Sequence, residues 1–156
     1  MTTMGTPTPG PIVRLVDNDP QVLKAVSRLL ASAGLQTEAS TSTSEFLDHY
    51  DASVPGCLVL DLAMPGGSGL DLQRALIDRH VDMPIVFLSG RNDVPSSVQA
   101  MKDGAFDFLT KPVDAEVLLS AVRHGIELDR AHRTRAEEEH QLQSRLATLT
   151  PREREV

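Results

Sequence analysis

Short segments with strand character alternate along this chain with stretches of helical periodicity. Most of the strand-like segments are apolar, and Gly, Pro, Asp or Ser residues bound them. They lie at residues 12–16, 35–39, 57–60, 85–88 and 105–109. Between them, apolar residues recur every three or four positions, which is typical of helices that bury one face. The pattern predicts an α/β fold, a (βα)5 doubly wound parallel five-stranded sheet with right-handed crossovers.

Capping signals mark where the first two helices begin. Asp19 and Pro20 suit a helix N-terminus, because Asp can cap free N–H groups and Pro fits the first helical position. Ser42 and Glu45 form a capping box before a second apolar stretch. Gly34 suits the left-handed position at the end of the first helix. The sequence therefore predicts helices that start at Pro20 and just after Ser42.

Polar side chains stand at the ends of four predicted strands. Residues 17–19 (Asp-Asn-Asp) follow the first strand and Asp61 ends the third. Ser89 ends the fourth strand and Lys111 follows the fifth. Because the carboxyl ends of parallel strands meet at one edge of a sheet, where ligands bind, these side chains are expected to form one site.

The residue types at this edge favour phosphoryl transfer. Clustered carboxylates suit Mg²⁺, which needs only one or two of them and keeps several waters. Asp61 can supply the attacking oxygen, Lys111 a fixed cation for one phosphoryl oxygen, and Ser89 a hydrogen bond to another. The site therefore predicts Mg²⁺-dependent transfer of a phosphoryl group to Asp61.

Several linked motifs point to a known family. They are VDND after the first strand, LVLDLAMPGGSGLDL around Asp61, VFLSG at Ser89, and VPSSVQAMKDGAFDFLTKP. With these motifs, the chain from Pro11 to about Arg130 resembles the receiver domains of two-component response regulators, in particular the FixJ-like subclass. The resemblance implies a flavodoxin-like receiver fold.

The resemblance also implies a role for each site residue. Asp61 is the expected phosphoacceptor, Lys111 the phosphate-contacting lysine and Ser89 the switch hydroxyl. Phe108 stands where the family has its switch aromatic, and an expected cis peptide bond precedes Pro112. The expected Mg²⁺ ligands are Asp17, Asn18, Asp61 and the backbone carbonyl of Ala63.

The family resemblance implies protein partners and no catalytic turnover. The expected partners are a sensor histidine kinase and, on phosphorylation, a second copy of the receiver that docks through the face formed by the fourth helix and fifth strand. DNA is expected to bind only through a further domain. The chain is expected to act as a regulator and not as an enzyme.

One position departs from the family pattern and keeps an alternative open. The family usually has two adjacent acids after its first strand, and the second is Asn18 here. An amide keeps an oxygen ligand but removes one negative charge, which weakens Mg²⁺ binding. The chain is therefore also compatible with a receiver that serves as a phosphorylation-independent interaction module.

A second alternative comes from the same loop. Asp17 and Asp19 satisfy the Asp-x-Asp pattern of haloacid dehalogenase-type phosphatases, with Asp17 as nucleophile. This interpretation lacks a later acidic pair and a cap domain, and it leaves the DFLTKP motif unexplained.

The helical pattern continues beyond the fifth predicted helix with few apolar residues. We divide the chain into a disordered tail at residues 1–10, a receiver at 11–127, a linker helix at 128–149 and the start of a LuxR-type helix-turn-helix domain at 150–156. The last assignment rests on LTPREREV, which resembles the opening of LuxR-type helix-turn-helix domains; in it Thr150 and Glu153 form a capping box that predicts a new helix. The linker helix is expected either to be a solvated spacer or to pair with a partner helix.

Composition narrows the function classes. The net charge of −7 over 156 residues argues that this part of the chain does not bind a phosphate backbone by itself. The lone Cys57 in an apolar strand predicts a buried thiol and a reducing compartment. No apolar run is long enough to span a bilayer and the start lacks signal-peptide features, so a cytoplasmic protein without a membrane partner is expected.

Overall fold

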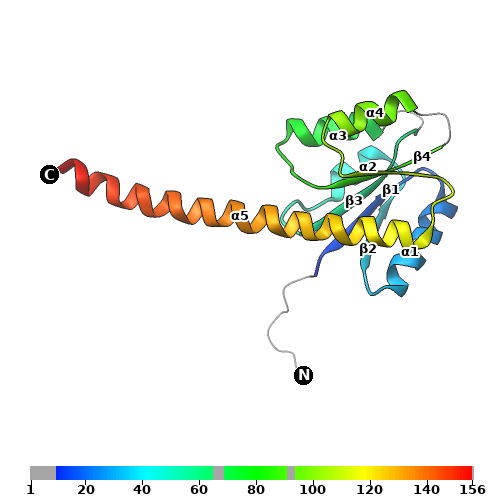
Figure 1. Ribbon diagram of the computed structural model, residues 1–156, viewed down its shortest axis with the longest axis horizontal. Helices are drawn as coiled ribbons and strands as arrows, with labels where there is room; N and C mark the ends of the chain where they lie inside the picture. The colour runs from blue at the N-terminus through cyan, green and yellow to red at the C-terminus, as the bar shows by residue number, and fades with distance from the viewer. Residues whose placement is uncertain (1–9, 65–68, 91–93, 156) are drawn as a thin grey trace, which may run out of the picture.

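A computed structural model of the chain describes residues 10–64, 69–90 and 94–155, with side chains described as far as residue 147 (Figure 1). A single sheet has the strand order β2-β1-β3-β4-β5, and every neighbouring pair is parallel. The predicted (βα)5 doubly wound parallel sheet is confirmed. The elements are β1 Ile12–Val16, α1 Pro20–Ser32, β2 Gln36–Ser40, α2 Thr43–His49, β3 Gly56–Asp61, α3 Gly69–Asp78, β4 Ile85–Ser89, α4 Val94–Lys102, β5 Asp107–Thr110 and α5 Ala115–Glu155.

The helices form two layers around a sheet whose central strands are fully buried. Every residue of β3 and of β4 is buried, as continuous apolar strands of a parallel sheet require. On one face, apolar side chains of α1 and α5, such as Leu30 and Val122, pack on the sheet. On the other face α2, α3 and α4 contribute side chains such as Phe46, Leu72 and Ala100. The sheet is therefore covered on both sides and presents its two ends for other roles.

The predicted caps form as expected, and the predicted edge strands shift. Asp19 accepts a hydrogen bond from the backbone N–H of Gln21 at 2.9 Å, and the Ser42 hydroxyl accepts one from the N–H of Glu45 at 3.1 Å. Gly34 has φ +83° after α1, in the left-handed region. Strands β2 and β5 begin one and two residues later than predicted, because pairing with β1 and β4 fixes the register of an edge strand more strongly than its own apolar pattern does.

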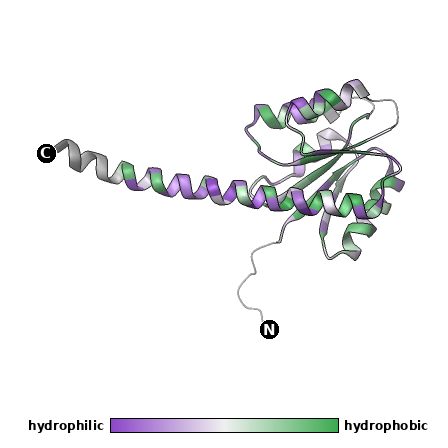
Figure 2. Ribbon diagram, viewed as in Figure 1, coloured by the Kyte–Doolittle hydropathy of each residue, from purple (hydrophilic) through white to green (hydrophobic). Residues whose placement is uncertain are grey.

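The last helix is one continuous element of 41 residues. It leaves the sheet as a long arm, and the coloured part of that arm is mostly hydrophilic (Figure 2). The separate helix start predicted at Thr150 is wrong, because α5 continues to Glu155. Pro151 removes one backbone donor, and the helix extends past that single lost hydrogen bond for another turn.

Two further findings bear on the sequence predictions. The predicted tail at residues 1–10 lies outside the described residues except for Gly10. In the described ranges 10–64, 69–90 and 94–155, no helix combines the length and apolar character that a bilayer crossing needs.

Candidate functional site

The carboxyl edge of the sheet brings two acids and a lysine into contact. Asp17 directly follows β1 and Asp61 is the last residue of β3, the neighbouring strand. The Lys111 ammonium, from the end of β5, lies 3.0 Å from Asp17 Oδ2 and 3.4 Å from Asp61 Oδ1. Residues 94 positions apart in the sequence thus meet because their strands end at the same edge.

The site is both buried and charged. Asp17 and Asp61 are 3% and 5% exposed, and one ammonium faces the two carboxylates, which leaves a local charge of −1. Burial, followed by the charge of Asp17, raises the pKa of the Asp61 carboxyl, and Lys111 opposes that rise only in part. Burial also opposes the charge of Lys111, but its hydrogen bond to Asp17 and the charge of Asp61 outweigh burial and raise the pKa of the lysine.

Backbone groups orient the two carboxylates. The N–H of Asp19 donates to Asp17 Oδ1 at 2.9 Å, and the N–H of Ala63 donates to Asp61 Oδ1 at 3.3 Å. Asn18 lies between the two aspartates of its loop and is exposed. The predicted ligand positions 17, 61 and 63 are therefore close together, and position 18 is open to solvent beside them.

Ser89 ends β4, the strand beside β3, and Phe108 lies on β5, the next strand along. Ser89 is fully buried at the end of β4, where its hydroxyl donates to the Gly90 carbonyl at 2.9 Å. The N–H of Lys111 donates to the Ser89 carbonyl at 2.7 Å, which couples the ends of β4 and β5. Phe108 is half-buried on β5 opposite Phe87, and the predicted cis bond before Pro112 is present.

The donor set fits Mg²⁺. Asp17 and Asp61 supply two carboxylates with an excess negative charge, which is the number that Mg²⁺ typically takes from a protein. The described residues contain no group of three or more His, Cys, Asp or Glu side chains that could hold a metal ion. Neutral oxygens such as the Asn18 amide or the Ala63 carbonyl could add to these two carboxylates.

Sequence reasoning missed a second group of buried charges at the opposite edge of the sheet. Arg14, Asp129 and Arg133 lie there, with Arg14 1% and Asp129 2% exposed. Two signals could have found them. Arg14 interrupts an otherwise apolar strand, and Asp129 precedes Arg133 by four positions on a helix, the spacing of a side-chain ion pair.

Comparisons with known proteins agree with the fold. The family model of the response regulator receiver domain matches residues 13–123. Response regulator protein TodT of Pseudomonas putida is 41% identical over 145 residues, which cover 93% of this chain and 64% of TodT. Transcriptional regulatory protein FixJ of Azorhizobium caulinodans is 39% identical over 147 residues, which cover 92% of this chain and 68% of FixJ.

A solved structure extends the likeness to the long helix. The structure of response regulator StyR superimposes with a TM-score of 0.88 at 40% identity, over 94% of this chain and 74% of StyR. Because only 6% of this chain is left out of that match, the match includes most of α5. The chain spans about 64% of the length of TodT, the first of these relatives. The chain belongs to the response regulator receiver domain family.

Proposed function

We propose that this chain accepts a phosphoryl group on Asp61 from a sensor histidine kinase, in a reaction that depends on Mg²⁺. The observation that carries the proposal is the contact of one ammonium, Lys111 Nζ, with the two buried carboxylates of Asp17 and Asp61. A nucleophile, a second acid and a fixed cation are the minimum that phosphoryl transfer to a carboxylate requires.

The residues divide the work of the transfer. A carboxylate oxygen of Asp61 forms a bond to phosphorus while the bond from phosphorus to the donor nitrogen breaks, and the electron pair leaves with that nitrogen, which takes up a proton. Partial burial makes Asp61 more basic than an ordinary aspartate, which favours attack. Lys111, already 3.4 Å from Asp61, is placed to neutralise a phosphoryl oxygen, and the Ser89 hydroxyl can turn from the Gly90 carbonyl to donate to another.

The metal ligands in this proposal are the carboxylates of Asp17 and Asp61, the side-chain oxygen of Asn18 and the backbone carbonyl of Ala63. A bound Mg²⁺ supplies positive charge that offsets the charge of the transferring phosphoryl group. Asp17 has two tasks in this arrangement, because its Oδ2 also holds the Lys111 ammonium.

The output of the proposed switch is dimerisation and control of transcription. Rearrangement of Ser89 and Phe108 on phosphorylation changes the face formed by α4, β5 and α5. That face exposes apolar side chains that a second receiver can cover, Val98 at 49%, Met101 at 46% and Val117 at 49%. Transcription control through a LuxR-type helix-turn-helix domain that begins at residues 150–156 is part of the proposal, and the relatives named as regulators support it.

Asn18 favours a second candidate, a phosphorylation-independent interaction module. One acid fewer at the metal site weakens the drive for Mg²⁺ binding. The phosphatase alternative has no such support, since the Asp19 carboxylate accepts from the N–H of Gln21 as the cap of α1 and is not free to act as a general acid.

Intact mass measurement tests the proposal. The protein is incubated with Mg²⁺ and phosphoramidate, in parallel with Asp61→Asn and with Asp48→Asn, which replaces an exposed aspartate of α2. We expect one added phosphoryl group in the parent and in Asp48→Asn, and none in Asp61→Asn. No label in the parent, with a conventional receiver labelled alongside, would favour the interaction module, and label that survives in Asp61→Asn would identify Asp17 as acceptor.

A further inference from the structure

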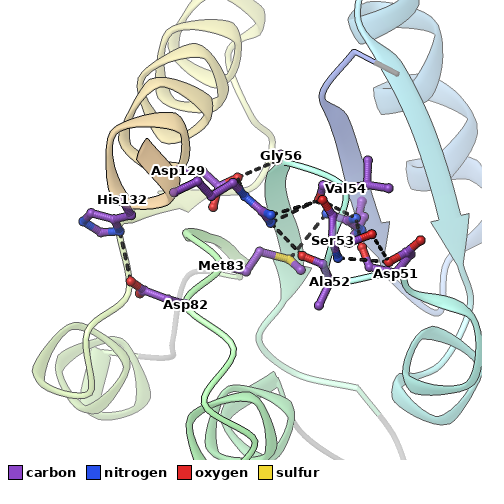
Figure 3. Close-up of polar contacts among 11 residues, drawn as sticks. Asp51, Ala52, Ser53, Val54, Gly56, Asp82, Met83, Asp129 and His132 are labelled. Carbon is purple, nitrogen blue, oxygen red and sulfur yellow. Dashed lines mark hydrogen bonds and ion pairs between the residues drawn. The ribbon is translucent and has the colours of Figure 1, made fainter. Parts of the chain in front are cut away.

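The edge of the sheet opposite Asp61 holds a second cluster of buried charges, shown in Figure 3. We call Arg14, Asp129 and Arg133 the amino-edge cluster, because they lie where β1 and β3 begin. Arg14 comes from β1, whereas Asp129 and Arg133 come from α5. All three contact backbone groups of residues 51–56, the connection that leads into β3.

Asp129 ties α5 to the first residue of β3. One carboxylate oxygen, Oδ2, accepts from the N–H of Gly56 at 2.9 Å and from Arg133 Nε at 2.8 Å. Gly56 has φ +154°, and a Cβ there would lie 1.8 Å from the carbonyl oxygen of Ile12, so only glycine fits. The helix is therefore bonded to a backbone position that the sheet itself holds rigidly.

Arg133 binds the same connection with its other nitrogens. Nη1 donates to the Ser53 carbonyl at 3.2 Å, and Nη2 donates to the carbonyls of Ala52 at 2.8 Å and Val54 at 3.3 Å. Nε is paired with Asp129 on the same helix, and both terminal nitrogens thus have partners inside the receiver. A planar guanidinium fits such a set of carbonyls because its donors form a rigid fork.

Arg14 supports this connection from the sheet side. Its Nη2 donates to the carbonyls of Asp51 at 2.7 Å and Val54 at 3.0 Å. The Val54 carbonyl therefore accepts from both arginines. On the other side of α5, His132 Nδ1 lies 3.1 Å from a carboxylate oxygen of Asp82, in the segment before β4. This contact is an ion pair only when His132 is protonated, so the arginines and Asp129 are the attachments that do not depend on it.

These contacts lie beyond the last core residue of α5, Ile126, and beyond the receiver boundary predicted at residue 127. Arg133 is seven residues past Ile126, about two helical turns. After Arg133, residues 134–147 are all exposed, so the amino-edge cluster is the final attachment of the helix among the side chains that the structure describes.

Gly125 lies just before the cluster and is a local weak point of α5. Glycine within a helix costs about 1 kcal/mol relative to Ala and loosens the backbone locally. A helix that carries an unsupported arm is most easily bent at such a point. The core packs Val122 and Ile126 on either side of this position. Asp129 and Arg133 then fix the next two turns of α5.

We propose that Asp129 and Arg133 fix the direction in which α5 leaves the receiver, so that whatever follows the helix is carried as a rigid extension of the sheet. The pair acts as a splint across Gly125. The role does not depend on phosphorylation of Asp61. For the two expectations on residues 128–149, it implies that the first two turns are bound to their own receiver.

Distance distributions from pulsed electron paramagnetic resonance test the proposal. Spin labels are placed at Lys24→Cys on α1 and Glu138→Cys on α5, both exposed, in a Cys57→Ala background. We expect a single narrow distribution in the parent and its loss in Arg133→Gln and Asp129→Asn. The matched control is Arg135→Gln, an exposed arginine two residues further along, which should keep the narrow distribution.

A second label pair separates loss of direction from loss of folding. Labels at Lys24→Cys and Asp48→Cys lie within the receiver, and we expect their distribution to stay unchanged in every variant. Arg133→Gln is decisive because its side chain is 35% exposed and water can replace it on the loop carbonyls. Adding Gly125→Ala to Arg133→Gln should restore part of the narrow distribution, because Ala stiffens the helix at this point. The added Cβ fits, since it would make ordinary contact with Cys57 Cβ at 3.4 Å, an atom that Cys57→Ala retains.

The opposite outcome is equally clear. A narrow α1–α5 distribution in Arg133→Gln that matches Arg135→Gln would overturn the proposal, because the helix would then hold its direction without the pair. A broad distribution in the parent would overturn it as well.

Discussion

The two edges of this sheet both bury charged groups, and they treat them in opposite ways. At the carboxyl edge Lys111 is shared between Asp17 and Asp61, so the site carries an excess negative charge. At the amino edge, hydrogen bonds within the chain occupy each nitrogen of Arg133 and the buried oxygen of Asp129. The carboxyl edge sets its charged side chains against one another, whereas the amino edge, with two arginines and one aspartate, directs most of its donors to backbone carbonyls.

Topology explains which edge received which role. The carboxyl ends of β1 and β3 open toward loops that diverge, so a ligand can reach Asp61 between them. The amino end of β3 lies beneath α5 and the connection formed by residues 51–54, whose carbonyls accept hydrogen bonds from the two arginines. Arginine satisfies several carbonyls at once, which suits a crowded edge, and lysine offers a compact charge that can shift between partners.

The largest effect on stability is expected at the amino edge, from replacing its most buried residue, Arg14. Arg14→Met keeps a long side chain but leaves the Asp51 carbonyl without its donor and the Val54 carbonyl with Arg133 alone. We expect the free energy of unfolding to fall by about 2–4 kcal/mol, measured by urea denaturation. Arg28→Met, at an exposed position of α1, is the control and should change little. A loss below about 1 kcal/mol in Arg14→Met would show that this edge does not depend on the guanidinium.

A smaller effect, on Mg²⁺ affinity, is expected from adding an acid at the carboxyl edge. Asn18→Asp adds a second acid beside Asp17 and should tighten Mg²⁺ binding about tenfold, which corresponds to about 1.4 kcal/mol. Titration calorimetry with MgCl₂ measures it. Gln21→Glu adds the same charge at an exposed position on the first turn of α1 and serves as the control. Equal tightening in both variants would mean that general charge, and not a ligand at position 18, governs the ion.

Sequence reasoning reached the carboxyl edge because its signals are local. Each strand end is marked by an apolar run that stops at a polar residue, and the topology of a parallel sheet then brings Asp17, Asp61 and Lys111 together. The caps at Asp19 and Ser42 were also readable, since each depends on a few adjacent residues.

The amino edge was not readable, because its partners are backbone carbonyls and distant side chains. Arg133 lies 79 to 81 positions from the carbonyls that it binds, and nothing in a sequence marks a carbonyl as unpaired. The Asp129–Arg133 pair has the spacing of an ordinary surface ion pair, and only the fold reveals that Asp129 is 2% exposed. The false helix start at Thr150 shows the converse, a local signal that the surrounding helix overrides.

The smallest effect is expected from relieving the charge imbalance itself, with Asp61→Asn. Burial and then the charge of Asp17 raise the pKa of Asp61 in the folded protein above the ordinary aspartate value of 3.8. The folded state therefore binds this proton more tightly than the unfolded state, and the ionised carboxylate lowers stability at neutral pH. Asp61→Asn removes that penalty, and Lys111 keeps Asp17 at 3.0 Å. We expect a gain on the order of 1 kcal/mol at pH 7.

The pH dependence distinguishes this cause from a general effect of the amide. The stability that a protonated Asp61 provides is complete below its unfolded pKa, near 3.8, and is lost as the pH rises through the higher folded pKa. The advantage of Asp61→Asn over the parent should therefore shrink as urea denaturation is repeated from pH 7 down toward pH 4. Asp48→Asn, at an exposed position, should show no such trend. A gain that stays constant with pH would contradict the charge imbalance at this edge, because only a carboxylate that titrates differently in the folded state can make the two variants converge.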